Sequence, residues 1–370
     1  MSVLIFIGVL ALLIFVHEFG HFLAAKLTGM KVEEFSVGFK PAIFQKKVGE
    51  TNYVLGLIPI GGYVKILGEN PDEEEEKKLS EEDKKRTFSA KPKWAQLLVL
   101  SAGVIFNILL AWIFIALSFS LGSEVAGKTD LPEKYLKKEG VKILVAKKDF
   151  PAEKNGIKGG EFIYKIQDTK SGDFVVNQGV EKFQEFLKNH PKNIQITYKK
   201  DWKSNKVFRT KVFDLKKEGE KYLAGIYMAE VYEVKIPFYK ALYYSIPATW
   251  EKLKNITNGL LEFFGQVFQA KANLDEVSGP VGIVKYIGTA AQNGIVALLL
   301  FTAMLSLNLA VINFLPFPAL DGGRALFVII EAISRKKIPQ NIFLWVNGLG
   351  FLFLIGLMVV ITFNDILKLL

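Results

Sequence analysis

The sequence contains 370 residues, half of them hydrophobic, and carries a formal charge of +10 at pH 7 with three histidines and no cysteine. The lack of cysteine excludes disulfides, thiolate metal ligands, iron–sulfur clusters and cysteine nucleophiles, so any catalysis must use histidine, carboxylates, hydroxyls or lysine. The positive charge comes mostly from scattered lysines without the arginine clusters of a nucleic-acid surface, which predicts anionic lipid headgroups and no nucleic acid as its partner.

Long apolar segments divide the chain into parts. They cover residues 3–25, 94–121, 294–314 and 344–366. A helix of about 20 mostly apolar residues spans the hydrocarbon core of a bilayer. The pattern therefore predicts a polytopic α-helical membrane protein with four transmembrane helices, and it disfavours a single soluble globule.

The basic residues near the ends of these segments predict an orientation. They gather in residues 26–93 and 316–343, whereas the N-terminus has none and the C-terminus has only Lys368. Because cytoplasmic loops carry the excess of Lys and Arg, these two segments are predicted to be cytoplasmic. Both termini and the long segment 122–290 are then predicted to be extracytoplasmic.

The first apolar segment contains the motif HEFGH at residues 17–21. His17 and His21 are four residues apart, so on a helix their rings project from one face and can bind one ion, while Glu18 projects beside that site. From composition alone, such a motif would arise on the order of once in a thousand chains. Ionisable groups inside a membrane helix are costly and indicate function. The alternative is an interhelical polar network without a metal, which does not require this spacing.

The loop that follows, residues 30–70, alternates apolar and small residues, as in TNYVLGLIPIGGYVKILGE from residue 51. This pattern predicts short β-strands joined at Gly and Pro. The mixed-charge run 71–86 is predicted to be a solvated, flexible loop. With the first two apolar segments, the loop makes up the first half of a predicted membrane core, residues 1–121.

Residues 122–230 are predicted to form a separate α/β module. Strands are expected at 141–145, 193–200 and 206–213, a turn, short helix and strand at 151–166, and an amphipathic helix at 180–190.

The segment 231–290 is aromatic and amphipathic over residues 237–270. This composition predicts a helix lying in the membrane interface. A long, packed soluble helix is the alternative.

A catalytic zinc site usually has three protein ligands and one position for water. With no cysteine, and with His190 in the outer module, the third ligand is expected to be a carboxylate. The third apolar segment ends in NFLPFPALDGG, residues 313–323, where Asp321 follows two helix-breaking prolines. Irregular backbone at membrane depth is tolerated only inside protein or beside a wet cavity, so Asp321 is the predicted ligand. The alternative is that Asp321 merely caps the next helix.

Residues 291–370 are predicted to form the second half of the membrane core. Together with the groups of the first half, Asp321 predicts hydrolysis of a carbonyl compound. Zinc lowers the pKa of its bound water towards neutrality, Glu18 accepts the proton, and the hydroxide attacks a polarised carbonyl. Asn313, an amide near the same depth, is predicted to donate to an oxyanion or to hold an extended substrate. A helix–helix hydrogen bond is the alternative role of Asn313.

HEFGH in the first segment together with NFLPFPALDGG at the end of a later one resembles the site-2 protease family of intramembrane zinc metalloproteases. The resemblance is strongest to its bacterial branch, the regulator of sigma-E protease type that cleaves anti-sigma factors. The similarity covers nearly the whole chain and includes LIPIGGYVKILGE (57–69), RTFSAKPKWAQLLVLSAGVIFN (86–107), SGPVGIVKYIG (278–288) and FND (363–365).

Carried over residue by residue, the resemblance implies Zn2+ as the cofactor, His17, His21 and Asp321 as its ligands, Glu18 as the base and Asn313 as an aid to substrate binding. The strands within 30–70 would resemble the family's membrane-inserted β-structure, whose edge pairs with the unwound substrate. Strand addition replaces the hydrogen bonds that a substrate helix loses and exposes the scissile bond.

The resemblance also implies partners and a location. The substrates would be single-span membrane proteins such as anti-sigma factors, and also signal-peptide remnants, often after an upstream site-1-type protease has removed an outer domain. The protein would lie in the bacterial cytoplasmic (inner) membrane, with the active site near the cytoplasmic side of the bilayer.

The outer module resembles a PDZ domain, because PAEKNGIKGGEFIYKIQ (151–167) is similar to the bacterial PDZ signature and YLAGIYM (222–228) to the strand beside a carboxylate-binding loop. Glu161 stands where Asp is usual and Asn155 where a small residue is usual, which favours the fold over peptide binding. The better-known Gram-negative members carry two such modules, whereas this chain has room for one. Where the family has GlyPro in the second span, this chain has Gly103 and Val104, a change expected to alter packing and to leave activity in place.

A catalytically silent membrane scaffold, which uses the outer module to bind extracytoplasmic tails, is the competing function. It has no need for a complete HEFGH motif together with Asp321. A transporter is disfavoured further, because the four segments show no internal repeat of the kind that transporters often carry.

Overall fold

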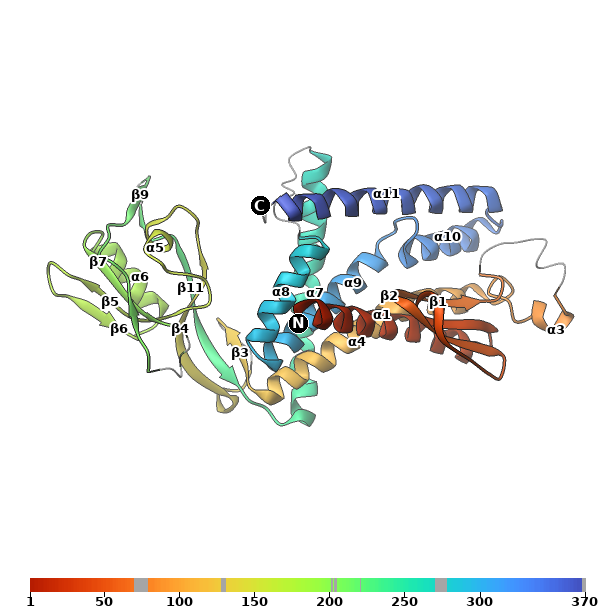
Figure 1. Cartoon of the computed structure of the whole chain (residues 1–370), viewed down its shortest axis with the longest axis horizontal. Coiled ribbons are helices and arrows are strands. Elements are labelled where there is room, and N and C mark those ends of the chain that lie inside the picture. Colours follow the sequence, from red (N-terminus) through yellow and green to blue (C-terminus); the bar gives the residue numbers. More distant parts are fainter. Residues whose placement is uncertain are drawn as a thin grey trace. The chain divides into compact units, whose positions relative to one another are not determined.

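The structure, a computed structural model, describes residues 1–69, 79–127, 131–200, 202, 205–219, 221–269 and 278–367. The chain divides into two compact units (Figure 1). The first unit comprises Met1–Ser118 and Ala241–Leu370, and the second comprises Phe119–Lys240.

Within the described residues, four helices are long and apolar enough to cross a membrane. They are α1 (Ser2–Leu27), α4 (Lys93–Leu121), α9 (Ile295–Phe314) and α11 (Gln340–Leu367). Three of them contain the predicted apolar segments, and α9 begins one residue later than predicted. The prediction of four membrane-spanning helices is confirmed, and the chain is a multi-pass membrane protein.

Three further helices of more than ten residues lie wholly or mostly in the first unit. They are α7 (Phe238–Phe268), α8 (Pro280–Gln292) and α10 (Asp321–Ser334). The long α7 continues through Pro247, and the Trp112 indole of α4 donates a 2.9 Å hydrogen bond to the Leu242 carbonyl in α7. A helix was predicted over 237–270, of which residue 270 lies outside the described part. Its position in the membrane interface stays a prediction.

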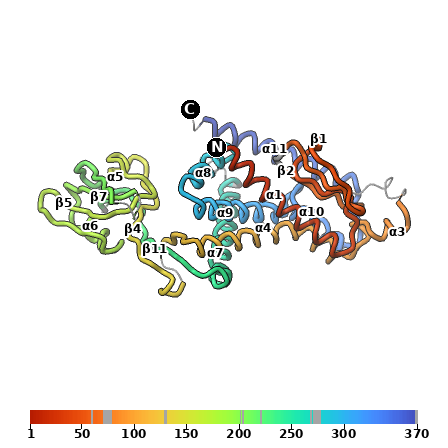
Figure 2. The backbone as a smooth tube through the Cα atoms, turned by 60° about the horizontal axis from the view of Figure 1, so that its bottom comes forward, coloured from red at the N-terminus to blue at the C-terminus, as the bar shows by residue number. Residues whose placement is uncertain are grey.

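The cytoplasmic loop of the sequence prediction is one long β-hairpin. Strands β1 (Val32–Val48) and β2 (Thr51–Ile66) pair antiparallel, and α1 contacts both strands (Figure 2). The predicted β-structure is present, as two strands that are longer than predicted. Residues 34–37 of β1 pair both with residues 62–65 and with residues 52–55 of β2, so the hairpin folds back on itself. Gly38, with a φ of +86°, lies where the register becomes irregular, as at a β-bulge.

The hairpin turn is tied to its surroundings by Glu50. The Glu50 carboxylate accepts two hydrogen bonds from Arg86, at 2.7 and 2.8 Å, and one from Lys26 at 2.7 Å. Arg86, and then Lys26, lowers the pKa of Glu50 from 4.5 to about 2. Because the folded-state pKa is depressed, this contribution to stability is present above pH 4.5 and is lost as the pH falls towards 2.

Of the predicted solvated loop 71–86, residues 71–78 lie outside the described residues. The rest of it contains the short helix α3 (Glu81–Lys84), which is capped by the Ser80 hydroxyl.

The second unit is built on an antiparallel sheet with the strand order β3-β11-β4-β5-β7-β8, and β6 pairs with β5. The strands are β3 (Ser123–Ala126), β4 (Leu136–Ala146), β5 (Phe162–Asp168), β6 (Phe174–Val176), β7 (Ile194–Lys199), β8 (Phe208–Arg209) and β11 (Ile226–Val234). A separate hairpin joins β9 (Lys216–Glu218) to β10 (Lys221–Leu223). The short helices are η1 (Glu133–Tyr135), α5 (Pro151–Lys154) and α6 (Val180–Asn189).

The core of this unit forms where α6 packs on the sheet. Phe183 and Leu187 of α6 join Ile163 and Ile196 from the strands in one buried cluster. The segment 222–228, predicted as one strand, is divided between β10 and β11. The interruption falls at Gly225, whose φ is +79° and which packs so closely on Phe150 that a Cβ would lie 2.1 Å from the Phe150 Cβ.

Candidate metal centre

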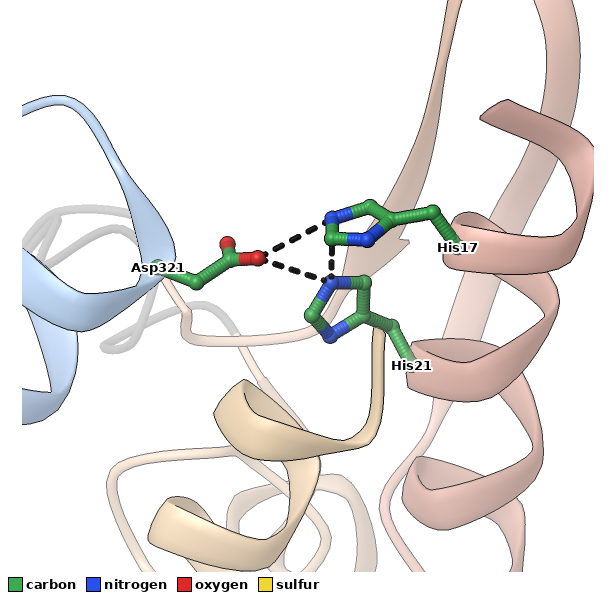
Figure 3. A group of neighbouring side chains, drawn as sticks. All are labelled: His17, His21 and Asp321. Atoms are coloured by element: carbon green, nitrogen blue, oxygen red, sulfur yellow. Dashed lines mark hydrogen bonds and ion pairs between the residues drawn. The ribbon is translucent and has the colours of Figure 1, made fainter. Parts of the chain in front are cut away.

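The structure brings the three predicted metal ligands together. His17 and His21 project from α1, and Asp321 is the first residue of α10 (Figure 3). The Asp321 Oδ2 atom lies 3.0 Å from His17 Nε2 and 3.2 Å from His21 Nε2. The two Nε2 atoms are themselves 3.2 Å apart. Three donor atoms from segments distant in sequence thus form a small triangle inside the protein.

This triangle fits a zinc ion. Ligands held about 2.1 Å from a tetrahedral ion lie about 3.4 Å from one another, close to the spacing of the three atoms. Asp321 Oδ2 is buried and makes no hydrogen bond, although both ring nitrogens are near it. A buried carboxylate oxygen without a hydrogen bond is costly unless a cation compensates it. Two imidazoles and a carboxylate are also a donor set that zinc enzymes use.

The segment between α9 and α10 places Asp321. A Cβ on Gly322 would lie 2.3 Å from the Phe314 carbonyl oxygen, and a Cβ on Gly323 would lie 2.1 Å from that of Phe317, so only glycine fits at either position. The N-cap of α10 is Leu320, and no side chain caps this helix. The carboxylate of Asp321 therefore faces the two histidines and does not serve as a helix cap.

The last membrane helix supports the same segment. Ala319 has a φ of +72°, a conformation that a non-glycine residue rarely adopts. Its N–H donates a 2.9 Å hydrogen bond to Asn347 Oδ1 in α11. One helical turn later, Gly350 packs so closely that a Cβ would lie 2.6 Å from Pro318 Cβ. The sequence analysis assigned no role to Asn347 or Gly350, and no local motif marks them.

The orientation of His21 is set by α4. The Nδ1 atom of His21 donates a 2.8 Å hydrogen bond to the Val99 carbonyl. This bond places the proton on Nδ1 and leaves the Nε2 lone pair directed at the centre of the triangle.

Asn107 occupies the equivalent place beside His17. It is fully buried, and its amide nitrogen lies 3.2 Å from His17 Nδ1, while its Oδ1 has no hydrogen-bond partner. The oxygen and nitrogen of an amide are assigned from their partners, and a half-turn of this amide directs Oδ1 at His17 Nδ1–H. The Asn107 backbone carbonyl accepts a 2.7 Å hydrogen bond from Ser306 of α9. Sequence reasoning gave Asn107 no role of its own.

Replacing Asn107 with Leu, which has a similar size, is expected to weaken zinc binding about 10- to 100-fold, the usual effect of removing the partner of a metal-ligating histidine. Asn107→Asp keeps an acceptor oxygen and is expected to retain most of the affinity. Competition with a chromophoric chelator measures both constants. Equal zinc affinities for the Leu variant and the wild type would show that Asn107 does not support the metal centre.

Gly103 of α4 lies directly against both imidazoles. A Cβ at this position would be 2.4 Å from His21 Nε2 and 2.6 Å from His17 Cε1. On α1, Gly20 lies between the two histidines, and a Cβ there would be 2.6 Å from the Ala102 carbonyl oxygen of α4. The two helices thus approach closely beside the triangle, and the space next to the histidines exists because residue 103 has no side chain.

The variant Gly103→Ala is expected to lose zinc binding, because the added methyl group displaces both rings. Alanine is the better helix former by about 1 kcal/mol, so helix propensity itself does not oppose this change. Gly356→Ala in α11 is the matched control, since nothing lies within 4 Å of a Cβ there. Zinc content by mass spectrometry should fall in the first variant and stay at the wild-type value in the second.

A cavity of about 170 Å³ opens onto the triangle. Its walls include His17, Glu18, His21 and Asp321, so the predicted base shares the cavity with the predicted ligands. The amide nitrogen of Asn313, on α9, lies 3.4 Å from His17 Nε2. This contact joins two helices, and the role of Asn313 toward a substrate stays a prediction.

Comparisons with known proteins agree with this arrangement. Residues 5–357 match the sequence model of peptidase family M50. A "putative zinc metalloprotease" of Clostridium perfringens is 36% identical over 360 residues, which cover 96% of this chain and 95% of the relative. Proteins of the same name from Clostridium acetobutylicum and Fusobacterium nucleatum are each 32% identical, covering 99% and 100% of this chain and 97% and 99% of the relatives.

Proposed function

Since the chain belongs to peptidase family M50 and is a zinc metalloprotease, we propose that it cleaves peptide bonds within the membrane-spanning segments of other membrane proteins. In this proposal His17, His21 and Asp321 bind the zinc ion and Glu18 is the general base. One observation carries it: the two histidines belong to a helix long and apolar enough to cross a membrane, and Asp321 closes a triangle of donor atoms with them. Ionisable groups at membrane depth indicate a functional site.

Several residues of the chain have separate roles in hydrolysis. Zinc, when bound, polarises the scissile carbonyl and acidifies the attacking water. The Glu18 carboxylate accepts a proton from that water and returns it to the leaving amine. Val99 and Asn107 hold the two imidazoles in the orientation that binding requires. The Asn313 amide donates to the carbonyl oxygen as negative charge develops there.

An edge of β2 beside the metal cavity supports an extended substrate. Among the described strands only β1 pairs with β2, which leaves β2 a free edge there. Gly62, Tyr63, Val64 and Ile66 of β2 line the metal cavity. A Cβ on Gly62 would lie 3.2 Å from Glu18 Cγ, so this backbone lies beside the base. An unwound substrate segment that pairs with β2 regains the hydrogen bonds it lost and brings its scissile bond to the zinc ion.

The finer assignments follow the resemblance stated above. The substrates are single-span proteins of the anti-sigma-factor type, trimmed first by a site-1-type protease, in a bacterial cytoplasmic membrane. The second unit acts as a PDZ-like size filter or docking module. Its two departures from the PDZ pattern have local partners: Glu161 accepts a 2.9 Å hydrogen bond from the Lys158 N–H, and the Asn155 amide donates to the Pro151 carbonyl at 2.7 Å. These bonds support the PDZ-like fold without supporting peptide binding.

Metal removal tests the proposal. In proteoliposomes with a single-span substrate, cleavage is expected to stop on treatment with 1,10-phenanthroline and to return on addition of Zn2+, with the cut mapped by mass spectrometry inside the apolar segment. A silent scaffold would bind substrate tails before and after chelation without producing fragments. Cuts confined to the substrate's soluble parts would contradict intramembrane cleavage.

A further inference from the structure

A second and larger cavity adjoins the metal cavity in the first unit. Its volume is about 360 Å³, which lies within the range of about 300–1,000 Å³ typical of ligand pockets. The start of α4, one side of α10 and the start of α11 form most of its wall. The two cavities share Glu69, Leu100 and Arg324, so these three residues stand in the partition between them.

An ion pair forms the polar part of that partition. The Arg324 guanidinium, three residues after Asp321 on α10, pairs with the carboxylate of Glu69, three residues after the end of β2. Their side chains are 27% and 16% exposed. Because both side chains keep some exposure, they can be rehydrated when the pair opens.

The course of the chain leads from one cavity to the other. The β2 residues Gly62 to Ile66 line the metal cavity, and the chain then continues through Leu67 to Gly68, which lines the second cavity. The Leu67 carbonyl accepts a 2.7 Å hydrogen bond from Phe88, another wall residue. An extended chain that pairs with the free edge of β2 and continues past Ile66 therefore meets the partition.

The chemistry of the second cavity suits apolar side chains. Phe327 and Phe343 lie in its wall with ring centroids 5.3 Å apart, and Phe88 is buried beside them. Four of the charged wall residues form two ion pairs, Lys93 with Glu331 at 2.6 Å and Arg324 with Glu69, and Lys337 also lines the wall. A membrane-spanning substrate segment is rich in large apolar side chains.

We propose that this second cavity is a subsite of the protease, and that it receives a large apolar side chain of the substrate segment running past Ile66 when the Arg324–Glu69 pair opens. The inference rests on the proposed intramembrane cleavage. It adds a place where the substrate is held away from the zinc ion, and so a determinant of which sequences are cut.

Site-specific photocrosslinking tests the subsite. The full chain carrying Glu18→Gln, to hold substrate uncleaved, receives p-benzoylphenylalanine in place of Phe327 or, separately, Phe343. The matched control places it at Phe351, further along α11, which is 59% exposed. With a single-span substrate that the wild type cleaves in proteoliposomes, crosslinking at 327 and 343 is expected to exceed that at 351 by about tenfold, the smaller end of the discrimination one apolar contact gives.

Crosslinks at 327 or 343 that map by mass spectrometry to an apolar residue near the cleavage site support the subsite. Crosslinks to lipid alone, or substrate yields equal to those at Phe351, overturn it. The zinc content of each variant verifies that the fold is intact. Testing positions 327 and 343 separately ensures that a local packing defect at one position does not decide the result. Cleavage by the wild type in the same vesicles is scored separately, so loss of the subsite and loss of the proposed function are distinguishable.

Discussion

Replacing Glu18 with Gln is expected to abolish proteolysis while zinc stays bound. The substitution keeps the shape of the side chain and removes the group that accepts a proton from water. A general base contributes about 10²- to 10⁴-fold to the rate, so cleavage of a reconstituted single-span substrate should fall by about that factor. Glu18 lines the metal cavity, and the triangle of donor atoms is made by other residues. Zinc content by mass spectrometry should therefore equal that of the wild type.

The matched control for this variant is Glu251→Gln, which changes an exposed glutamate of α7 in the same way. It is expected to cleave at the wild-type rate. If Glu18→Gln cleaves as fast as this control, Glu18 is not the base. If it loses zinc together with activity, Glu18 acts in metal binding and the division of roles proposed above is wrong.

Replacing Asp321 with Asn is expected to remove zinc as well as activity. The amide keeps the size of the side chain, but it lacks the negative charge that helps to bind a divalent cation. Loss of a partner outside the ligand set already costs about 10- to 100-fold in metal affinity, so loss of a ligand should exceed about 100-fold. Competition with a chelator, followed by an assay at saturating zinc, separates weaker binding from lost catalysis.

Asp365→Asn provides the comparison for that variant. Asp365 is another buried carboxylate of the first unit, and it accepts a 2.8 Å hydrogen bond from the Gly282 N–H at the start of α8. Its substitution is expected to lower thermal stability and leave zinc affinity unchanged. Wild-type zinc affinity in Asp321→Asn would instead show that Asp321 is not a ligand, and a wild-type protein that binds no zinc would favour the polar network without a metal.

Much of this architecture could be predicted because it depends on local signals. Apolar segments long enough to cross a bilayer predicted four membrane helices. The described residues contain four such helices, and they surround the candidate site. The spacing of His17 and His21 placed both rings on one helix face without any knowledge of the fold. The lack of cysteine favoured a carboxylate as the third ligand, and the position of Asp321 after two prolines at the end of a membrane segment distinguished it from the other carboxylates.

The partners of the histidines could not be predicted in the same way. Asn107 and Gly103 act through contacts with residues more than 80 positions earlier in the chain, and long-range packing leaves no periodic trace in a sequence. The lengths of β1 and β2 were underestimated for a different reason. Gly38 and its neighbours have the composition of strand ends, and the pairing is irregular there, but both strands continue through the irregular region.

The bond between Ala319 and Asn347 has a consequence for when the enzyme becomes active. Asp321 sits on a segment held by the final membrane helix, about 300 residues after His17. A ribosome adding about 5–20 residues per second needs roughly 15–60 seconds to cover that distance. Throughout that interval the nascent chain carries two of the three proposed zinc ligands and lacks the third. Under the proposed function, proteolysis cannot begin before Asn347 has been synthesised and has bound the Ala319 segment.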